Sequence, residues 1–340
     1  MSAHNALRST ILVAAALALL LTTTPATAQD NEVQALQMDT SGSISGEIKP
    51  APWSGYWWSR ARGFMVKGWP NHSPAPFERY DQYVMSRIQK NPGSHAWESN
   101  IRNTHYNPKA EQWEGHCNGW SASSILAPEP RENVVRNSIE FTVGDQKALL
   151  AEQYMNTYCM FYGERNWGDG DEDDIYPDQF HKLLLEYLHG KKSAVVADTD
   201  CGKMVWNFPM YKFESSWSTG WFNDKRLKVR TTCYFTSDDV APEYTGLKWF
   251  SKTYTYNLFI DDDGTVTGGE WTGSSKSDHP DFIWVPTGDA PNPQGTVQEN
   301  PCLHPQFVKE ITQGMPRDEG AETEPQAVLL EAGLQPTDLF

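Results

Sequence analysis

The chain has 340 residues and a formal net charge of −16, with 44 acidic side chains against 28 lysines and arginines. This balance argues against nucleic acid as a partner, because nucleic-acid binding needs a basic surface that neutralises phosphates. The length allows one large domain or two small ones. The aromatic content, 14 Trp, 14 Tyr and 14 Phe, fits either a heavy core or an aromatic-lined groove for protein or glycan.

The N-terminus has the pattern of a secretory signal peptide over residues 1–28. Arg8 gives a positive start, residues 11–21 form an apolar run, and Ala26-Thr27-Ala28 is a small-residue cleavage site. The apolar run is too short to span a bilayer, which takes about 20 residues. No comparable run follows. We therefore predict cleavage near Ala28 and a secreted, extracellular or periplasmic protein with no transmembrane segment.

Residues 29–50 are polar and rich in Ser and Gly, which is typical of a disordered linker. The aromatic run that follows should anchor the chain on its core. Apolar positions at helical spacing then predict a helix over residues 73–90, ended by Asn91-Pro92-Gly93. Beyond residue 290 the chain is rich in Pro, Gly and Glu, and we predict a largely irregular tail over 291–340, with at most a short helix at 305–311. The predicted catalytic domain is therefore 51–290.

The stretch from Glu114 to Leu126 organises that domain. Small and polar residues suit a tight turn, and a small-residue helix follows until Pro128 stops it. Cys117 would therefore lie at a helix N-terminus, where unpaired N–H groups and the helix dipole stabilise a thiolate. The same N–H groups can hold an oxyanion. The plain alternative is a disulfide half or a buried thiol.

Two more helices are predicted before the pattern changes. One covers residues 145–161 with Asp145 as its N-cap, and the other begins at Pro177 and ends before Gly190. His181 falls beside the apolar face of the latter, which favours a surface position. From residue 193 the apolar period becomes two, and strands are predicted over 193–198, 203–213, 226–235, 253–260, 265–271 and 281–285, with Pro209 at an edge or bulge and a hairpin turn at Asp263-Gly264. Helices followed by antiparallel strands indicate an α+β fold.

All five cysteines remain after the signal peptide is cleaved. An oxidising compartment favours disulfide bonds, and pairing of an odd number leaves one cysteine as a free thiol. Cys201 and Cys233 lie on neighbouring predicted strands and form the most plausible disulfide. The parity supports a reactive Cys117, although one bridge with three free thiols also fits. No CxxC pair or Cys/His cluster has zinc spacing, so the sequence predicts no metal site.

The loop over residues 168–174 is strongly acidic. Asp169, Asp171 and Asp173 alternate as the first ligands of a calcium loop do, but Asp174 replaces the glycine at the sixth position and Phe180 the glutamate at the twelfth. An EF-hand is therefore not expected; the default interpretation is a solvated acidic loop, with a looser calcium site as the alternative.

Two blocks together carry a family resemblance. The first is GHCNGWSASSI over residues 115–125, and the second is VWNFP over residues 205–209 with Phe213 four residues on. They resemble the transglutaminase elicitor family of oomycete cell-wall glycoproteins and their bacterial relatives. Family members carry a surface peptide of this second pattern that plant immune systems detect. The Arg-Gly pair before its Phe is Tyr211-Lys212 here, so plant recognition does not carry over. The runs GGEW at 268–271 and HPDFIW at 279–284 are also similar to this family.

The resemblance covers about residues 50–290 and implies a protein-glutamine γ-glutamyltransferase in a papain-like cysteine-enzyme fold, related to streptococcal immunoglobulin-cleaving proteases. It also implies calcium dependence. In this chemistry Cys117 attacks a glutamine carboxamide, ammonia leaves, and a lysine amine takes the acyl group from the thioester. The implied partners are protein substrates that supply the glutamine and the amine. Water as acceptor would give deamidation, and a peptide bond as substrate would give proteolysis.

The general base should be a histidine. His116 is adjacent to Cys117, but neighbours at a helix start point apart, so it fixes the turn or lines the groove. His279 comes much later, at the mouth of a predicted strand, which is the order of papain-like enzymes, and we prefer it as the base. The orienting carboxylate stays open among Asp198, Asp200, Asp281 and Asp289, with a lean toward Asp198.

Trp120 and Trp206 are aromatic candidates for a substrate groove, with core packing as the commoner alternative for each. Two rival functions remain open at this point. One is a secreted cysteine protease on the same scaffold, and the other is a non-catalytic elicitor or binding protein with an aromatic contact surface.

Overall fold

The computed structural model describes residues 35–69, 73–103, 105–165, 174–199, 202–220, 223–288 and 299–314. The predicted signal peptide, most of the acidic loop, Asp200 and Asp289 lie outside these residues, so those predictions stay open. Cys201 lies outside them as well. Within the described ranges, no helix is long and apolar enough to cross a membrane.

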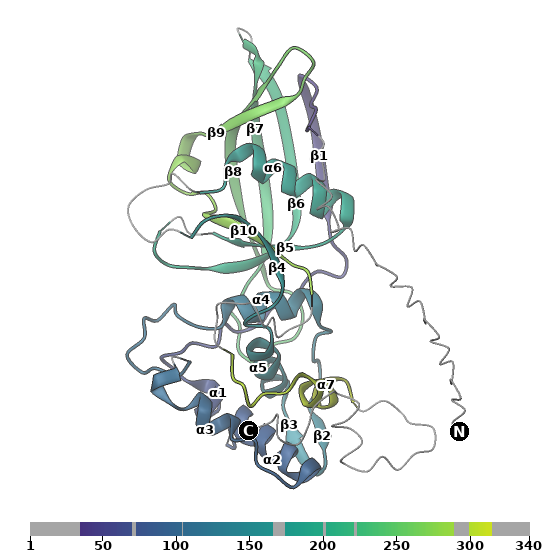
Figure 1. Ribbon diagram of the computed structural model, residues 1–340. Helices are drawn as coiled ribbons and strands as arrows, with labels where there is room; N and C mark the ends of the chain where they lie inside the picture. Colours follow the sequence, from purple (N-terminus) through teal and green to yellow (C-terminus); the bar gives the residue numbers. More distant parts are fainter. Residues whose placement is uncertain are drawn as a thin grey trace, which may run out of the picture. The chain divides into compact units, whose positions relative to one another are not determined.

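Helices and antiparallel strands together make up the structure, which confirms a mixed α+β architecture (Figure 1). The helical elements are α1 Phe64–Lys67, α2 Pro76–Ile88, α3 Ser94–Glu98, η1 Ile101–Asn103, α4 Cys117–Leu126, α5 Val143–Gln153, α6 Pro177–Leu183, the π-helical η2 Leu184–Lys191, η3 Gly273–Lys276 and α7 Pro305–Gln313. The strands are β1 Ser41–Glu47, β2 Val134–Arg136, β3 Ile139–Phe141, β4 Cys159–Gly163, β5 Val195–Asp198, β6 Asn207–Gly220, β7 Asn223–Thr236, β8 Trp249–Ile260, β9 Val266–Trp271 and β10 Phe282–Pro286.

The main sheet has the strand order β4-β10-β5-β6-β7-β8-β9, and its described pairings are antiparallel. The long strands β6, β7 and β8 run side by side in Figure 1. The hairpin turn predicted between β8 and β9 is confirmed, with Gly264 at φ 85°, a backbone conformation that glycine adopts without strain. Pro209 lies in the central strand β6 rather than at an edge, next to a register shift between Met210 and Lys212.

Both boundaries of the predicted domain need correction. Residues 41–47 are not a disordered linker, because they form β1 and pair with β6 from Ser218 to Lys212. Alternating Ser and Gly offer little apolar surface, and the strand is held by backbone pairing instead. At the other end, α7 packs Phe307, Val308 and Ile311 into the core, so the folded unit extends past residue 290.

The predicted helix 145–161 is wrong at both ends. It begins earlier, because Thr142 is the N-cap: its Oγ1 accepts from Asp145 N at 3.1 Å while the Asp145 carboxylate accepts from Thr142 N at 2.8 Å. It ends at Gln153, since residues 159–163 form β4 and pair with β10. Here sheet pairing overrides the helical spacing of the apolar residues.

Two apolar cores hold these elements. The first gathers α2, α4, α5 and α7 around side chains such as Phe77, Trp120 and Phe141, and it includes Trp53 and Trp58 of the predicted aromatic anchor. The second lies between α6 with η2 and strands β5 to β8. Cys233 is fully buried in it as a free thiol, so the predicted bridge to Cys201 is wrong.

His181 is also buried in the second core rather than on the surface, with its Nδ1 2.6 Å from the Tyr256 hydroxyl. The sheet covers the flank of α6 that the helical pattern alone left open to solvent.

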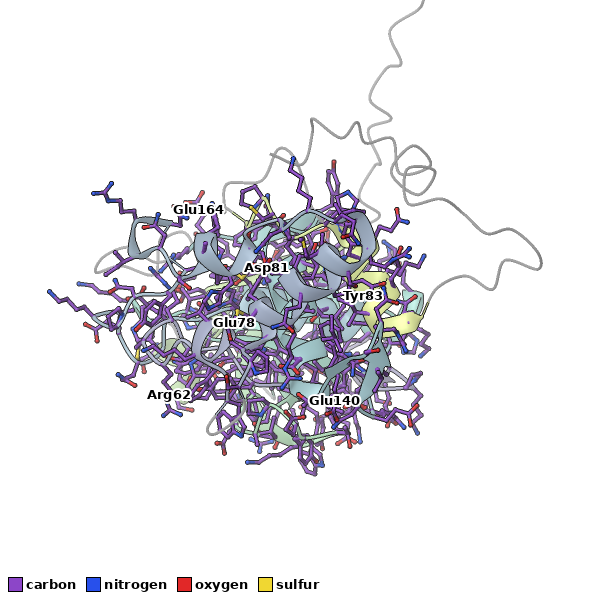
Figure 2. All side chains as sticks on the ribbon, turned by 90° about the horizontal axis from the view of Figure 1, so that it is seen from below. Arg62, Glu78, Asp81, Tyr83, Glu140 and Glu164 are labelled. Atoms are coloured by element: carbon purple, nitrogen blue, oxygen red, sulfur yellow. The ribbon has the colours of Figure 1, made fainter. Side chains whose placement is uncertain are left out.

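Helix α2 ties the helical elements together. Figure 2, seen from below, labels Glu78, Asp81 and Tyr83 of this helix. Asp81 Oδ1 accepts from Ser94 N at 2.9 Å, at the start of α3, and the Tyr83 hydroxyl donates to Glu310 Oε2 of α7 at 2.6 Å. The first bond holds α3, whose last residue, Glu98, lies near His116 at the start of α4, and the second holds α7.

Candidate active site

Cys117 is the first residue of α4, as the sequence predicts, and His116 is its N-cap. The helix packs directly on α5, because a Cβ at Gly119 would lie 1.9 Å from Ala151 O. On another side it packs on β6, where Ser121 Oγ donates to Asn207 O at 2.8 Å. The turn is therefore held between a helix and the sheet.

The two sequence blocks meet at the sulfur. Cys117 Sγ lies 3.8 Å from Val205 O, and Asn207 Nδ2 donates to Sγ at 3.6 Å. Trp284 Nε1 donates to Asn207 Oδ1 at 2.8 Å, which fixes the amide so that its NH₂ faces the sulfur. Much of the VWNFP block is buried, Asn207 and Pro209 included. In this chain the block builds the surroundings of Cys117.

Burial raises the pKa of the Cys117 thiol, and the hydrogen bonds from Asn207 oppose that shift only in part. The charges of Asp238 and Asp198 raise the pKa further. Cys117 is only 7% exposed, and this burial is the largest cause of the raised pKa. These surroundings oppose the thiolate that a helix N-terminus alone would favour.

A cavity of about 600 Å³ opens onto this sulfur. Its lining comes from Arg60, from the turn into α4, from the segment that runs from Met155 through β4, and from the region of β6 and β10, which lie on either side of β5 in the sheet. The lining residues are Arg60, Trp113, Glu114, Gly115, Cys117, Asn118, Met155, Asn156, Thr157, Cys159, Phe161, Arg165, Val205, Asn207, Phe282 and Trp284. A second free thiol, Cys159, therefore shares the cavity with Cys117. This mixture of aromatic and polar groups in the lining suits a long amino-acid side chain presented by a peptide.

The predicted groove residues lie elsewhere. Trp120 is fully buried in the first core, where it packs over Gly55, and His116 faces away from the cavity. Trp206 is half-buried and stacks on Phe208 at 6.2 Å between ring centroids. Neither Trp120, His116 nor Trp206 therefore lines the cavity that Cys117 and Asn207 face.

The predicted base and its carboxylate are also not assembled as expected. His279 is buried, with Nε2 3.1 Å from Asp174 Oδ2 and Nδ1 2.8 Å from Ser275 O, and it stacks on Trp271. Asp198 instead accepts from Trp206 N at 2.8 Å. The carboxylate that contacts His279 is thus Asp174, which is none of the four aspartates predicted for this role. The structure does not bring His279 into contact with Cys117, whose sulfur touches Val205 and Asn207.

Behind the Cys117 turn lies a charged cluster that sequence reasoning missed. It consists of Glu98, His105, His116 and Glu152, all buried. His105 Nδ1 lies 3.2 Å from Glu152 Oε2 and 3.3 Å from Glu98 Oε2. Burial acts to lower the pKa of His105, but the two carboxylates raise it to about 11. Burial acts to raise the pKa of Glu152, but the imidazoles lower it to about 2. The four residues come from separate segments, so no sequence spacing could reveal them.

Calcium does not fit this cluster, because calcium prefers oxygen ligands and two of the four groups are imidazoles. The acidic loop that could supply oxygens lies outside the described residues, apart from Asp174. Calcium dependence therefore stays a prediction.

Comparison with known proteins identifies relatives. The sequence model of the transglutaminase elicitor family matches residues 98–239 and 234–300. The fold is similar to the crystal structure of the GP42 transglutaminase from Phytophthora sojae, with a TM-score of 0.61 and 21% identity. The match covers 82% of this chain and 94% of that one, and at this identity it establishes a shared fold. No curated protein matches the sequence.

Proposed function

The chain belongs to the transglutaminase elicitor family, and we propose that it is a secreted transglutaminase with Cys117 as nucleophile. The observation that carries this proposal is the convergence of Cys117 and Asn207 at one cavity of about 600 Å³. A papain-like arrangement, with the nucleophile at the start of a helix that packs on an antiparallel sheet, is part of the proposal.

The reaction begins when Cys117 Sγ attacks the carboxamide carbon of a glutamine side chain. The thiol proton passes to a base and then to the departing nitrogen, which leaves as ammonia. The carbonyl oxygen becomes negative in between. Donors suited to it are the N–H groups at the start of α4 and Asn207 Nδ2, which Trp284 already aims at the sulfur. A lysine amine then attacks the thioester and frees the sulfur.

His279 is the proposed base, oriented by Asp174 rather than by Asp198. Support comes from the buried imidazole–carboxylate pair and from its place just before β10, whose Phe282 and Trp284 line the cavity. The proposal requires this segment to approach the sulfur when substrate binds, since catalytic hydrogen bonds often form only in the complex. His279→Gln should lower kcat by about 10² to 10⁴. His95→Gln is the control, because His95 contacts Val66 O outside the cavity.

The experiment that tests the activity is incorporation of a fluorescent amine into a glutamine-rich protein. The native chain should label the acceptor protein, with ammonia released in equal amount. Ammonia release without amine incorporation would make the chain a deamidase, and fragments of the acceptor would make it a protease. If none of these occurs, the non-catalytic elicitor function is the better one.

A further inference from the structure

We propose that Glu98, His105, His116 and Glu152 form a closed site for one divalent transition-metal ion, zinc foremost, behind the Cys117 turn. One ligand atom from each residue lies within 4.8 Å of every other, so the four groups already converge on one point. Ligand atoms of a tetrahedral zinc ion lie about 3.3 Å apart, so small side-chain movements complete the site. The site joins the end of α3, the 105 loop, the N-cap of α4 and the last turn of α5.

The orientation of His116 points to a ligand. Its Nδ1 lies 3.1 Å from Trp58 O, and donation of the Nδ1 proton there leaves Nε2 with a lone pair. Nε2 is buried without a hydrogen-bond partner, although it is 3.0 Å from Glu152 Oε2. A metal-binding histidine characteristically donates its other ring N–H to a backbone carbonyl in this way. An ion between Nε2 and the carboxylates would satisfy this nitrogen.

The carboxylates are oriented as well. Asn300 N donates to Glu152 Oε1 at 2.7 Å, and Asn300 Nδ2 donates to Glu98 Oε2 at 3.2 Å. The backbone and the side chain of Asn300 thereby hold both acidic groups beside the imidazoles. Such outer hydrogen bonds are what a metal site uses to fix its ligands.

The cluster also has room for one ion. A small cavity of about 10 Å³ is lined by Glu98, His105 and His116, together with Trp58 and neighbouring residues. That volume accommodates a single water-sized particle. It is separate from the larger cavity at Cys117.

Charge and ligand type select the ion. Two carboxylates balance one divalent cation with both imidazoles neutral, so the buried site carries no net charge. Mixed imidazole and carboxylate ligands suit zinc and its first-row neighbours rather than calcium or magnesium. Two protons shared between the imidazoles and the carboxylates would also balance the charge. A protonated cluster without a metal ion is therefore the alternative that the experiment has to distinguish.

The test uses the full chain stripped with a chelator. Zinc titration by calorimetry should give one site per chain, and added zinc should raise the melting temperature. Cobalt(II) in its place should give the visible absorption of a four-coordinate site without a thiolate charge-transfer band, which separates this cluster from the free cysteines. Cys159→Ser should leave both results unchanged.

His105→Gln should lose the stoichiometric binding, whereas His189→Gln should keep it, because His189 is exposed and lies outside the cluster. If His105→Gln does not fold, the cobalt spectrum of the native chain decides. The proposal would be overturned by the absence of stoichiometric zinc binding, by a thiolate band, or by unchanged binding in a folded His105→Gln protein. The cluster would then be a protonated hydrogen-bond network without a metal ion.

Discussion

The two sides of one helical turn differ in what they do. On one side of the start of α4, Cys117 faces a cavity of about 600 Å³ and an asparagine amide. On the other side, His116 faces two glutamates and a histidine, beside a small cavity of about 10 Å³. Consecutive residues at a helix start point apart, so two neighbours in sequence belong to two chemical environments.

In the proposed function, the Cys117 side carries the reaction and the His116 side stabilises the fold. An acyl transfer needs space for substrate and few, well-aimed polar groups, and the cavity side provides these. The cluster side buries four ionisable groups that stabilise the fold only as a set, because a buried charge without its partner is costly. Substitutions on the two sides should therefore have opposite signatures, in activity on one and in stability on the other.

Cys117→Ala should have the largest effect on activity. Loss of the nucleophile should lower amine incorporation by about 10³-fold or more, with the urea midpoint almost unchanged. Cys159→Ser is the matched control, since its thiol lines the same cavity, and it should keep most of the activity. Equal losses in the two variants would remove the special role of Cys117.

Glu152→Gln should show the reverse signature. Its carboxylate contacts His105 and His116, so its loss should lower the free energy of unfolding by about 3 to 5 kcal/mol. Glu186→Gln, in an exposed pair with Lys191, should cost less than about 1 kcal/mol. Urea unfolding of both variants measures the contrast, and a small effect at Glu152 would mean that the cluster does not hold the turn.

His181 offers a third case, a buried imidazole paired with a hydroxyl instead of carboxylates. Burial lowers its pKa from 6.5 to about 4. Between these values the unfolded chain binds a proton that the folded chain does not, so stability is present at neutral pH and falls as the pH drops from 6.5 through 4. The expected loss by pH 4.5 is about 2 to 3 kcal/mol. The measurement is the free energy of unfolding of the native chain and of His181→Gln at pH 7.5 and pH 4.5. The loss at pH 4.5 should be smaller in His181→Gln, and an equal loss in both proteins would contradict the burial effect.

Asn207→Ala should reduce kcat by about 10- to 10²-fold, less than the loss of the nucleophile, because the helix N–H groups remain as donors. The matched control is Asn257→Ala, a buried asparagine whose amide donates to Glu270 in the sheet. Steady-state kinetics with a glutamine peptide should show the fall in kcat only for Asn207. A change in KM alone would make Asn207 a substrate-binding group instead.

Local patterns predicted much of this structure. The start of α4 at Cys117, the Gly264 hairpin and the alternating strands follow from residue spacing and turn chemistry. The predictions that were wrong depend on tertiary contacts. Residues of β4 and β1 form strands because they pair with β10 and β6, and His181 is buried because the sheet covers it. The buried cluster was beyond reach because its residues converge from four segments, and Asp174 as the partner of His279 could not be told from the other aspartates of its loop.

The central claim is that acyl transfer passes through Cys117. Its most direct test is mass spectrometry of the intact protein after incubation with a glutamine donor peptide and no amine. The predicted result is an adduct equal to the peptide less ammonia, mapped to Cys117, released by added amine and absent from Cys117→Ala. An adduct on Cys159, or none under conditions where amine incorporation proceeds, would contradict the account.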